Sequence, residues 1–214
     1  MRPLYVINFK TYGESTGKNA LKLAGICSKV AKQKKAVIII CLQPSDICLS
    51  KKIEIPVFAQ HIDPVSQGQT TGYVLAESVK SQGAKGTLLN HSEHRMNFPD
   101  LKKAVGICRR LKLKTVVCAS TPLEAKKIKS LNPDYIAIEP PELIGGKVSV
   151  SEARPEIITK TTKAVKKIPV LCGAGVHNKT DVKKAVELGA KGVLVASGVV
   201  KSKDPEKALK ELIL

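Results

Sequence analysis

The chain alternates short runs of apolar and β-branched residues with longer amphipathic segments from one end to the other. This alternation is typical of βα units around a parallel sheet, because helices cover such a sheet and its buried strands become nearly continuous apolar runs. The predicted strands are Leu4 to Phe9, Ala36 to Leu42, Val57 to Gln60, Gly86 to Asn90, Thr115 to Cys118, Tyr135 to Ile138, Pro169 to Cys172 and Gly192 to Ala196.

The segments between these runs carry the start and stop signals of helices. Thr121-Pro122 and Asp204-Pro205 each place a capping residue before a proline at the first helical position. Gly83-Ala84-Lys85-Gly86 recurs as Gly189-Ala190-Lys191-Gly192, before the predicted fourth and eighth strands. Glycine suits the left-handed position just past a helix end. The spacing favours two halves of an eight-stranded βα barrel, although the repeat alone also allows an open doubly wound sheet.

Nothing in the sequence divides the chain into parts. No linker or low-complexity stretch interrupts the series, and 214 residues suit one barrel domain. We therefore expect a single domain over residues 1–214. No apolar run approaches the roughly 18 residues of a membrane span, and no signal peptide precedes the first strand, so a soluble protein away from membranes is expected.

The composition bears on partners and compartment. The formal net charge is +18, and most lysines fall on the polar faces of predicted helices, which favours a solvated outer shell. Such a field could also attract phosphorylated substrates or bind nucleic acid nonspecifically. Aromatic residues make up only 3% of the chain, which argues against stacking platforms for single strands. We expect no specific nucleic-acid partner.

The cysteines and histidines predict no metal centre. The six cysteines form no Cys-x-x-Cys pair, and most lie inside apolar runs. That pattern is typical of reduced, buried thiols in a cytoplasmic protein. The four histidines also lack the spacing of metal ligands.

Ionisable residues follow three of the predicted strands. Lys10 follows the first strand, His91 the fourth and Glu139 the sixth. In a barrel these side chains would meet at one mouth, where the carboxyl ends of the strands converge. Taken singly, they could be a surface lysine, a capping histidine and a solvated carboxylate. Glu139 also precedes Pro140-Pro141 and a glycine-flanked loop, which suggests a base with a lid. His61 lacks such a context and is expected to be structural.

Two glycine-rich turns follow the last two predicted strands. They are Gly173-Ala174-Gly175 and Ala196-Ser197-Gly198. Small residues leave backbone N–H groups free to point at an anion, and a helix N-terminus adds to this attraction. Together with the ionisable cluster, the turns predict a phosphate cradle.

These motifs together resemble the triosephosphate isomerase family. The short chain and the Pro140-Pro141-Glu142-Leu143-Ile144-Gly145 segment are similar to its archaeal branch. The resemblance runs through the whole chain. The motifs that carry it are Asn8-Phe9-Lys10, His91-Ser92-Glu93 with Arg95, Glu139-Pro140, Ile144-Gly145, Gly173-Ala174-Gly175-Val176 and Ala196-Ser197-Gly198.

The resemblance implies a (β/α)8 TIM barrel that interconverts dihydroxyacetone phosphate and glyceraldehyde 3-phosphate. In the known chemistry of the family, Glu139 would be the base, and neutral His91 would polarise the carbonyl. Lys10 would offset developing negative charge. No metal or organic cofactor is needed, because proton transfer beside a carbonyl requires only a base and an electrophile. The implied substrate-binding residues are Asn8, Lys10, Ile144, Gly145, Gly175, Ala196 and Ser197, and the implied supporting residues are Ser92, Glu93 and Cys118.

The chain departs from the family at two places. Gly146-Lys147 follow Gly145 where the family usually has Thr-Gly, and His94 stands where it often has arginine. The first departure bears on the far hinge of the lid, and the second on the order of the site. Neither falls on the implied base, electrophile or lysine.

Assembly and two other functions stay open from the sequence. Gly68-Gln69-Thr70-Thr71-Gly72 resembles the projecting loop by which the family dimerises, and archaeal members often pair dimers into tetramers. A homo-oligomer, dimer or tetramer, is therefore implied. The alternative functions are a basic nucleic-acid-binding protein on a degenerate barrel and a different phosphosugar isomerase.

Overall fold

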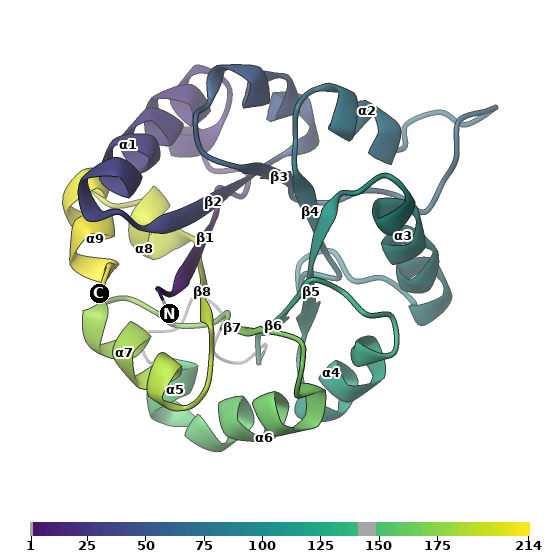
Figure 1. Ribbon diagram of the computed structural model, residues 1–214. Coiled ribbons are helices and arrows are strands. Elements are labelled where there is room, and N and C mark those ends of the chain that lie inside the picture. The colour runs from purple at the N-terminus through teal and green to yellow at the C-terminus, as the bar shows by residue number, and fades with distance from the viewer. Residues whose placement is uncertain (1, 141–148) are drawn as a thin grey trace.

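The computed structural model describes residues 2–140 and 149–214 and contains a closed parallel barrel (Figure 1). Each strand pairs with the next along the chain, and the first pairs with the last. Closure confirms the predicted barrel and rules out the open sheet. The strands are β1 (Leu4–Asn8), β2 (Val37–Leu42), β3 (Val57–Ala59), β4 (Gly86–Leu89), β5 (Lys114–Ala119), β6 (Tyr135–Ile138), β7 (Val170–Cys172) and β8 (Gly192–Val195).

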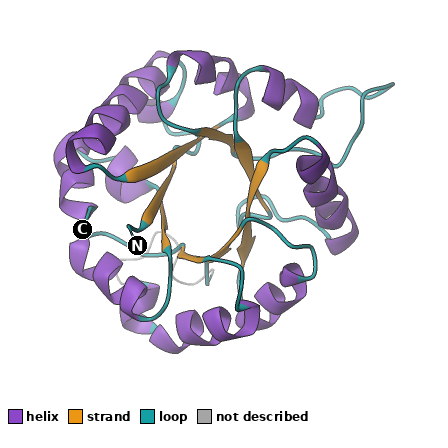
Figure 2. Cartoon of the chain, viewed as in Figure 1, coloured by secondary structure: helices purple, strands orange, loops and turns teal. Residues whose placement is uncertain are grey.

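Helices form a ring around the strands, as Figure 2 shows. Within the described ranges, short helices also lie in several of the loops. No helix of these residues is long and apolar enough to cross a membrane. The helices are η1 (Gly13–Ser15), α1 (Lys18–Lys34), η2 (Pro44–Lys52), α2 (Ala76–Ser81), α3 (Phe98–Arg110), α4 (Pro122–Lys129), α5 (Val150–Ala153), α6 (Pro155–Val165), α7 (Lys179–Glu187), α8 (Ser197–Val200) and α9 (Pro205–Leu212).

Alternate residues of the strands build two separate cores. Leu4 and Val6 belong to a cluster with side chains from the other strands, including Phe58 and Leu171. Tyr5 and Ile7, the neighbours of Leu4 and Val6, belong to a larger cluster with helix residues. Because successive side chains of a strand point to opposite faces, one strand fills the barrel and also holds the helices against it.

The predicted helix signals act as expected. The side chain of Thr121 accepts a hydrogen bond from the N–H of Glu124, and that of Asp204 accepts one from Lys207. Gly83 and Gly189 have φ angles of 102° and 101°, just past α2 and α7. These are positions where a side chain would strain the backbone.

The charged surface and the thiols mostly follow the predictions. Most of the lysines on the outer helix faces are exposed, as in a solvated shell. All six cysteines are free; five are buried, whereas Cys48 in η2 is exposed.

Some strands end one residue earlier than predicted. The predicted fourth strand included Asn90, but Asn90 has a φ of 59°, in the left-handed region, so the extended backbone stops at Leu89. The first strand ends at Asn8, and Lys10 has a φ of 50°. In both places the chain turns sharply where it leaves the barrel.

Gly192 tests how tightly the barrel closes. A Cβ atom at this position would lie 2.0 Å from the carbonyl oxygen of Leu4. We expect Gly192→Ala to lower the free energy of unfolding by about 3 kcal/mol, because backbone would have to move. Urea unfolding measures this loss.

Gly106 provides the matched control. It lies within α3, and a Cβ atom there would meet nothing within 4 Å. Gly106→Ala should stabilise the protein by about 1 kcal/mol, as expected for an exposed helix position. Equal effects of the two substitutions would show that β1 and β8 are not held this closely.

Candidate active site

Lys10 lies at the carboxyl end of β1 in a fixed turn. Its N–H donates to Oδ1 of Asn8 at 3.0 Å, and its carbonyl accepts from Nε2 of Gln60 at 2.9 Å. The ammonium group lies 2.6 Å from Oε1 of Glu93, which follows β4. The side chains of Asn8 and Gln60 therefore both hold the backbone at Lys10. Gln60 is a second support that sequence reasoning missed.

His91 lies at the carboxyl end of β4 and is buried. The N–H of Glu93 donates to Nδ1 of His91 at 3.2 Å. A nitrogen that accepts a hydrogen bond carries no proton, so in the neutral ring the proton is on Nε2. Nε2 lies 3.5 Å from Oε1 of Glu139. The imidazole thus presents a donor to the interior of the mouth.

Glu139 is the most buried ionisable group of the cluster, with 3% of its surface exposed. Burial raises the pKa of its carboxyl above 4.5, and His91, the thiol of Cys118 and Lys10 oppose the shift. Oε2 has no hydrogen-bond partner of normal geometry among the described residues. A carboxylate with a raised pKa and a free oxygen is suited to accept a proton.

Gly173 makes room for Glu139. The N–H of Gly173 donates to the carbonyl of Ile138 at 3.0 Å, so the first residues after β6 and β7 lie side by side. A Cβ atom on Gly173 would lie 2.4 Å from Cγ of Glu139. Only glycine allows this approach without displacing the base.

The two predicted turns face the same space. Gly175 has a φ of 65°, and α8 begins at Ser197, directly after Ala196. A cavity of about 70 Å³ connects the turns with the ionisable cluster. Seven predicted site residues line it: Asn8, Lys10, His91, Glu139, Gly175, Ala196 and Ser197.

Asp181 anchors the turn after β7. Its Oδ2 accepts from the N–H of His177 at 2.9 Å, and its Oδ1 accepts from the hydroxyl of Ser149 at 3.1 Å. Asp181 and Asn178 also form a capping box at the start of α7. The capping pattern is visible in the sequence, but the contact with Ser149 is not, because 32 residues separate the pair.

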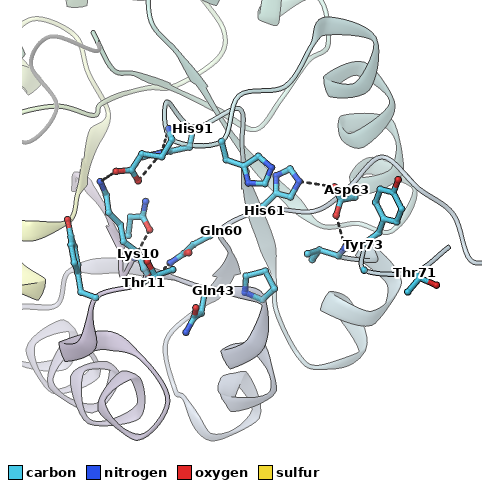
Figure 3. Close-up of a pocket in the computed structure, with 16 residues that line it drawn as sticks. Lys10, Thr11, Gln43, Gln60, His61, Asp63, Thr71, Tyr73 and His91 are labelled. Atoms are coloured by element: carbon cyan, nitrogen blue, oxygen red, sulfur yellow. Dashed lines mark hydrogen bonds and ion pairs between the residues drawn. The ribbon is translucent and has the colours of Figure 1, made fainter.

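A second cavity of about 790 Å³ adjoins the first and shares Lys10 and His91 with it. In Figure 3, these two residues lie at one end, Thr71 and Tyr73 lie at the other, and His61 lies between them. The ring of His61 stacks on that of His94, with centroids 3.9 Å apart.

The stacked rings bring together His61 and His94, which the sequence did not predict to be in contact. His61 is buried, and its Nε2 lies 3.3 Å from Oδ1 of Asp63. Burial, with the charge of His94, lowers the pKa of His61. His94, one of the two departures from the family pattern, stacks its ring on His61, and its N–H donates to the carbonyl of His91 at 2.8 Å.

Of the remaining predicted residues, some lie next to the ionisable cluster and others lie outside the described ranges. Glu93 contacts Lys10 and His91, and the thiol of Cys118 interacts with Glu139. The hydroxyl of Ser92 is buried without a hydrogen-bond partner among the described residues. Ile144 and Gly145, which were predicted to bind substrate, lie outside the described residues.

The arrangement of these groups defines a class of site. A buried carboxyl group faces an imidazole ring, an ammonium group lies nearby, and two turns rich in small residues line the same cavity. Such a barrel mouth can move a proton next to the carbonyl of an anionic substrate.

Comparison with known proteins identifies the family. Its model, that of triosephosphate isomerase, matches residues 3–213. Triosephosphate isomerase of Methanothermus fervidus is 49% identical over 217 residues, which cover 99% of this chain and 98% of that protein. The Methanocaldococcus jannaschii protein of the same name is 48% identical over 215 residues, with 98% of each covered. The chain belongs to the triosephosphate isomerase family, and its archaeal relatives agree with the predicted archaeal-type branch.

Solved structures of low sequence identity share the fold, as one example shows. N-acetylmannosamine-6-phosphate 2-epimerase from Clostridium perfringens superposes with a TM-score of 0.68 at 19% identity, covering 92% of this chain and 86% of that one. At this identity the likeness concerns the barrel and not the reaction.

The buried carboxyl of Glu139 predicts how stability depends on pH. Its folded pKa is raised, so its contribution to the free energy of unfolding is present below about pH 4.5 and is lost as the pH rises through the folded value. Glutamine is neutral throughout. Glu139→Gln should therefore exceed the wild type in stability by more at about pH 8 than at about pH 4.

Urea unfolding at the two pH values measures the difference. Glu211→Gln is the control, because that carboxylate lies on α9 with 66% of its side chain exposed. A stability difference between Glu139→Gln and wild type that stays constant with pH would contradict the raised pKa.

Proposed function

We propose that the chain, acting as one domain, catalyses the interconversion of dihydroxyacetone phosphate and glyceraldehyde 3-phosphate at the smaller cavity. The observation that carries the proposal is the 3.5 Å approach of Nε2 of His91 to Oε1 of Glu139, inside a family of isomerases of this name. The approach supports the proposal, because a proton acceptor and a hydrogen-bond donor this close together could both reach one small substrate.

Glu139 acts as the base. Its carboxylate takes a proton from the carbon beside the substrate carbonyl, and an enediolate forms. The carboxyl then returns the proton to the neighbouring carbon, which completes the isomerisation without net oxidation. Because burial raises its pKa, the carboxylate is a stronger base than an exposed glutamate.

His91 and Lys10 stabilise the charge that develops on the substrate oxygens. The Nε2–H of His91 polarises the carbonyl and passes protons between the two enediolate oxygens, as in the known chemistry of the family. The ammonium of Lys10, which contacts Glu93 in the structure, turns to the substrate when it binds. Charges and dipoles already aimed at the reacting oxygens need no reorganisation during the reaction.

The phosphate binds at the turns after β7 and β8. Backbone N–H groups of Gly175, Ala196 and Ser197 are the donors, together with Ile144 and Gly145 of the predicted lid. The positive charge of the chain attracts the dianionic substrate. The residues need no metal or organic cofactor, since base and electrophile suffice. Buried thiols further support a cytoplasmic location.

A coupled assay with glyceraldehyde 3-phosphate tests the proposal. General base catalysis typically contributes ~10²–10⁴-fold, so Glu139→Gln should lower kcat by about that factor. KM should change little, because the phosphate contacts remain. Gln33→Arg, on the exposed face of α1, should keep full activity. A Glu139→Gln protein with wild-type kcat would overturn the assignment of the base.

We also propose that two copies pair through the loop after β3. In Figure 1 this loop projects beyond the ring of helices. Its residues 66–73 are exposed, and Tyr73 keeps 56% of its surface accessible. The loop of one copy would enter the 790 Å³ cavity of the other, beside Lys10 and His91. Pairs of such dimers would give a tetramer.

Sedimentation at low and high salt tests the pairing. Each copy carries a net charge of +18, so association should strengthen as salt screens the repulsion. Thr71→Arg, which adds bulk and charge to the loop, should shift the protein to monomer and lower kcat. Gln33→Arg adds the same charge on another face and should leave the sedimentation unchanged. A Thr71→Arg protein that sediments like the wild type would exclude this interface.

A further inference from the structure

Asn90 has an unusual backbone directly before His91. Its φ is 59°, a conformation that costs most residues energy and that asparagine tolerates better than others. It is also buried, with 1% of its surface exposed. A turn of this kind, at the end of β4, sets the direction in which the chain carries the imidazole.

The side-chain amide of Asn90 both donates and accepts hydrogen bonds. Its Nδ2 donates to the carbonyl of Cys118 at 2.9 Å and to Oε1 of Glu124 at 3.1 Å. Its Oδ1 accepts from the N–H of Met96 at 3.0 Å. The amide thus ties the end of β4 to β5, to α4 and to the returning loop.

Two charged residues complete this network. Arg95 pairs with Oε1 of Glu124, and its Nη1 donates to the carbonyl of Asn90 at 3.3 Å. Oε2 of Glu124 accepts from the N–H of Ser120 at 2.8 Å. The side chain and the carbonyl of Asn90 are therefore both held, which leaves the turn little freedom.

Cys118 connects this network to the base. Its carbonyl accepts from Asn90, whereas its thiol interacts with Glu139. Cys118 therefore contacts both Asn90 and Glu139, the residue that His91 faces.

We propose that Asn90 is a positioning residue for the isomerisation, because its left-handed turn and its amide hydrogen bonds fix where His91 presents Nε2 to Glu139. Asn90 touches no substrate and acts through His91 alone. The inference rests on the proposed function. It explains why asparagine, with a side chain that both donates and accepts, stands at a position where glycine would satisfy the backbone.

Asn90→Gly separates the side chain from the backbone. Glycine adopts the left-handed conformation freely, so the turn remains possible while the three amide hydrogen bonds are lost. We expect kcat to fall about 10- to 100-fold, since small misplacements of a catalytic group have effects of this size. KM should stay within about twofold of wild type, because the phosphate turns follow β7 and β8.

Asn132→Gly is the matched control. Asn132 also has a left-handed backbone, with a φ of 52°, but it is exposed and precedes β6, at the opposite end of the barrel. The same chemical change there should leave kcat and KM unchanged.

A double-mutant cycle with His91→Gln decides the role. If Asn90 acts only through the imidazole, Asn90→Gly should change kcat by less than about twofold in the His91→Gln background. An equal loss in both backgrounds, or an unchanged kcat in the wild-type background, would overturn the inference. Should Asn90→Gly not fold, Asn90→Asp enters the same cycle, since it keeps the acceptor for Met96 and loses the donor.

The activity of the wild-type protein distinguishes a failure of the role of Asn90 from a failure of the proposed function. A wild-type protein without isomerase activity would refute the proposed function. An active wild type with additive effects in the cycle would refute the role of Asn90 only.

Discussion

Closure of the parallel sheet is the constraint on which the rest of the structure depends. Because β1 pairs with β8, all eight carboxyl ends meet at one rim, and residues far apart in the chain become neighbours there. Lys10, His91 and Glu139 follow three different strands, and none of them is close to another in sequence. The backbone pairing of the strands is enough to bring them to one rim. The contacts described here then adjust angles and distances within a frame that the backbone hydrogen bonds have already set.

At the rim, β1 and β4 end in sharp turns, and these turns set the direction of the residues that follow. Lys10 and Asn90 both take left-handed conformations, which break the extended backbone within one residue. Each turn is held by amide side chains: Asn8 and Gln60 for Lys10, and the amide of Asn90 itself beside His91. Two of the six non-glycine residues with a left-handed backbone in the described ranges thus lie beside the predicted chemistry, and the surrounding hydrogen bonds keep them in place.

The sequence predicts the barrel and the cluster well, and the reasons are local. Strand runs, caps at Thr121 and Asp204, and paired glycines are short-range patterns, and the ionisable residues directly follow strands. The sequence does not predict contacts between distant turns, such as Asp181 with Ser149 or the stacked rings of His61 and His94. It also places the strand end at Asn90 one residue too late. These features depend on which loops the closed barrel brings together, and chain order contains no such information.

The glycine beneath the base limits how the site can be altered. Glu139 occupies the space that a side chain at Gly173 would need. The position of its carboxylate therefore depends on the absence of a side chain there as well as on its neighbours. The shape of the cavity and the position of Glu139 are therefore linked, because a side chain at Gly173 would displace the carboxylate. A design for a larger ligand would have to enlarge the turn at Ala196 to Gly198, which lines the same cavity, and keep glycine at position 173.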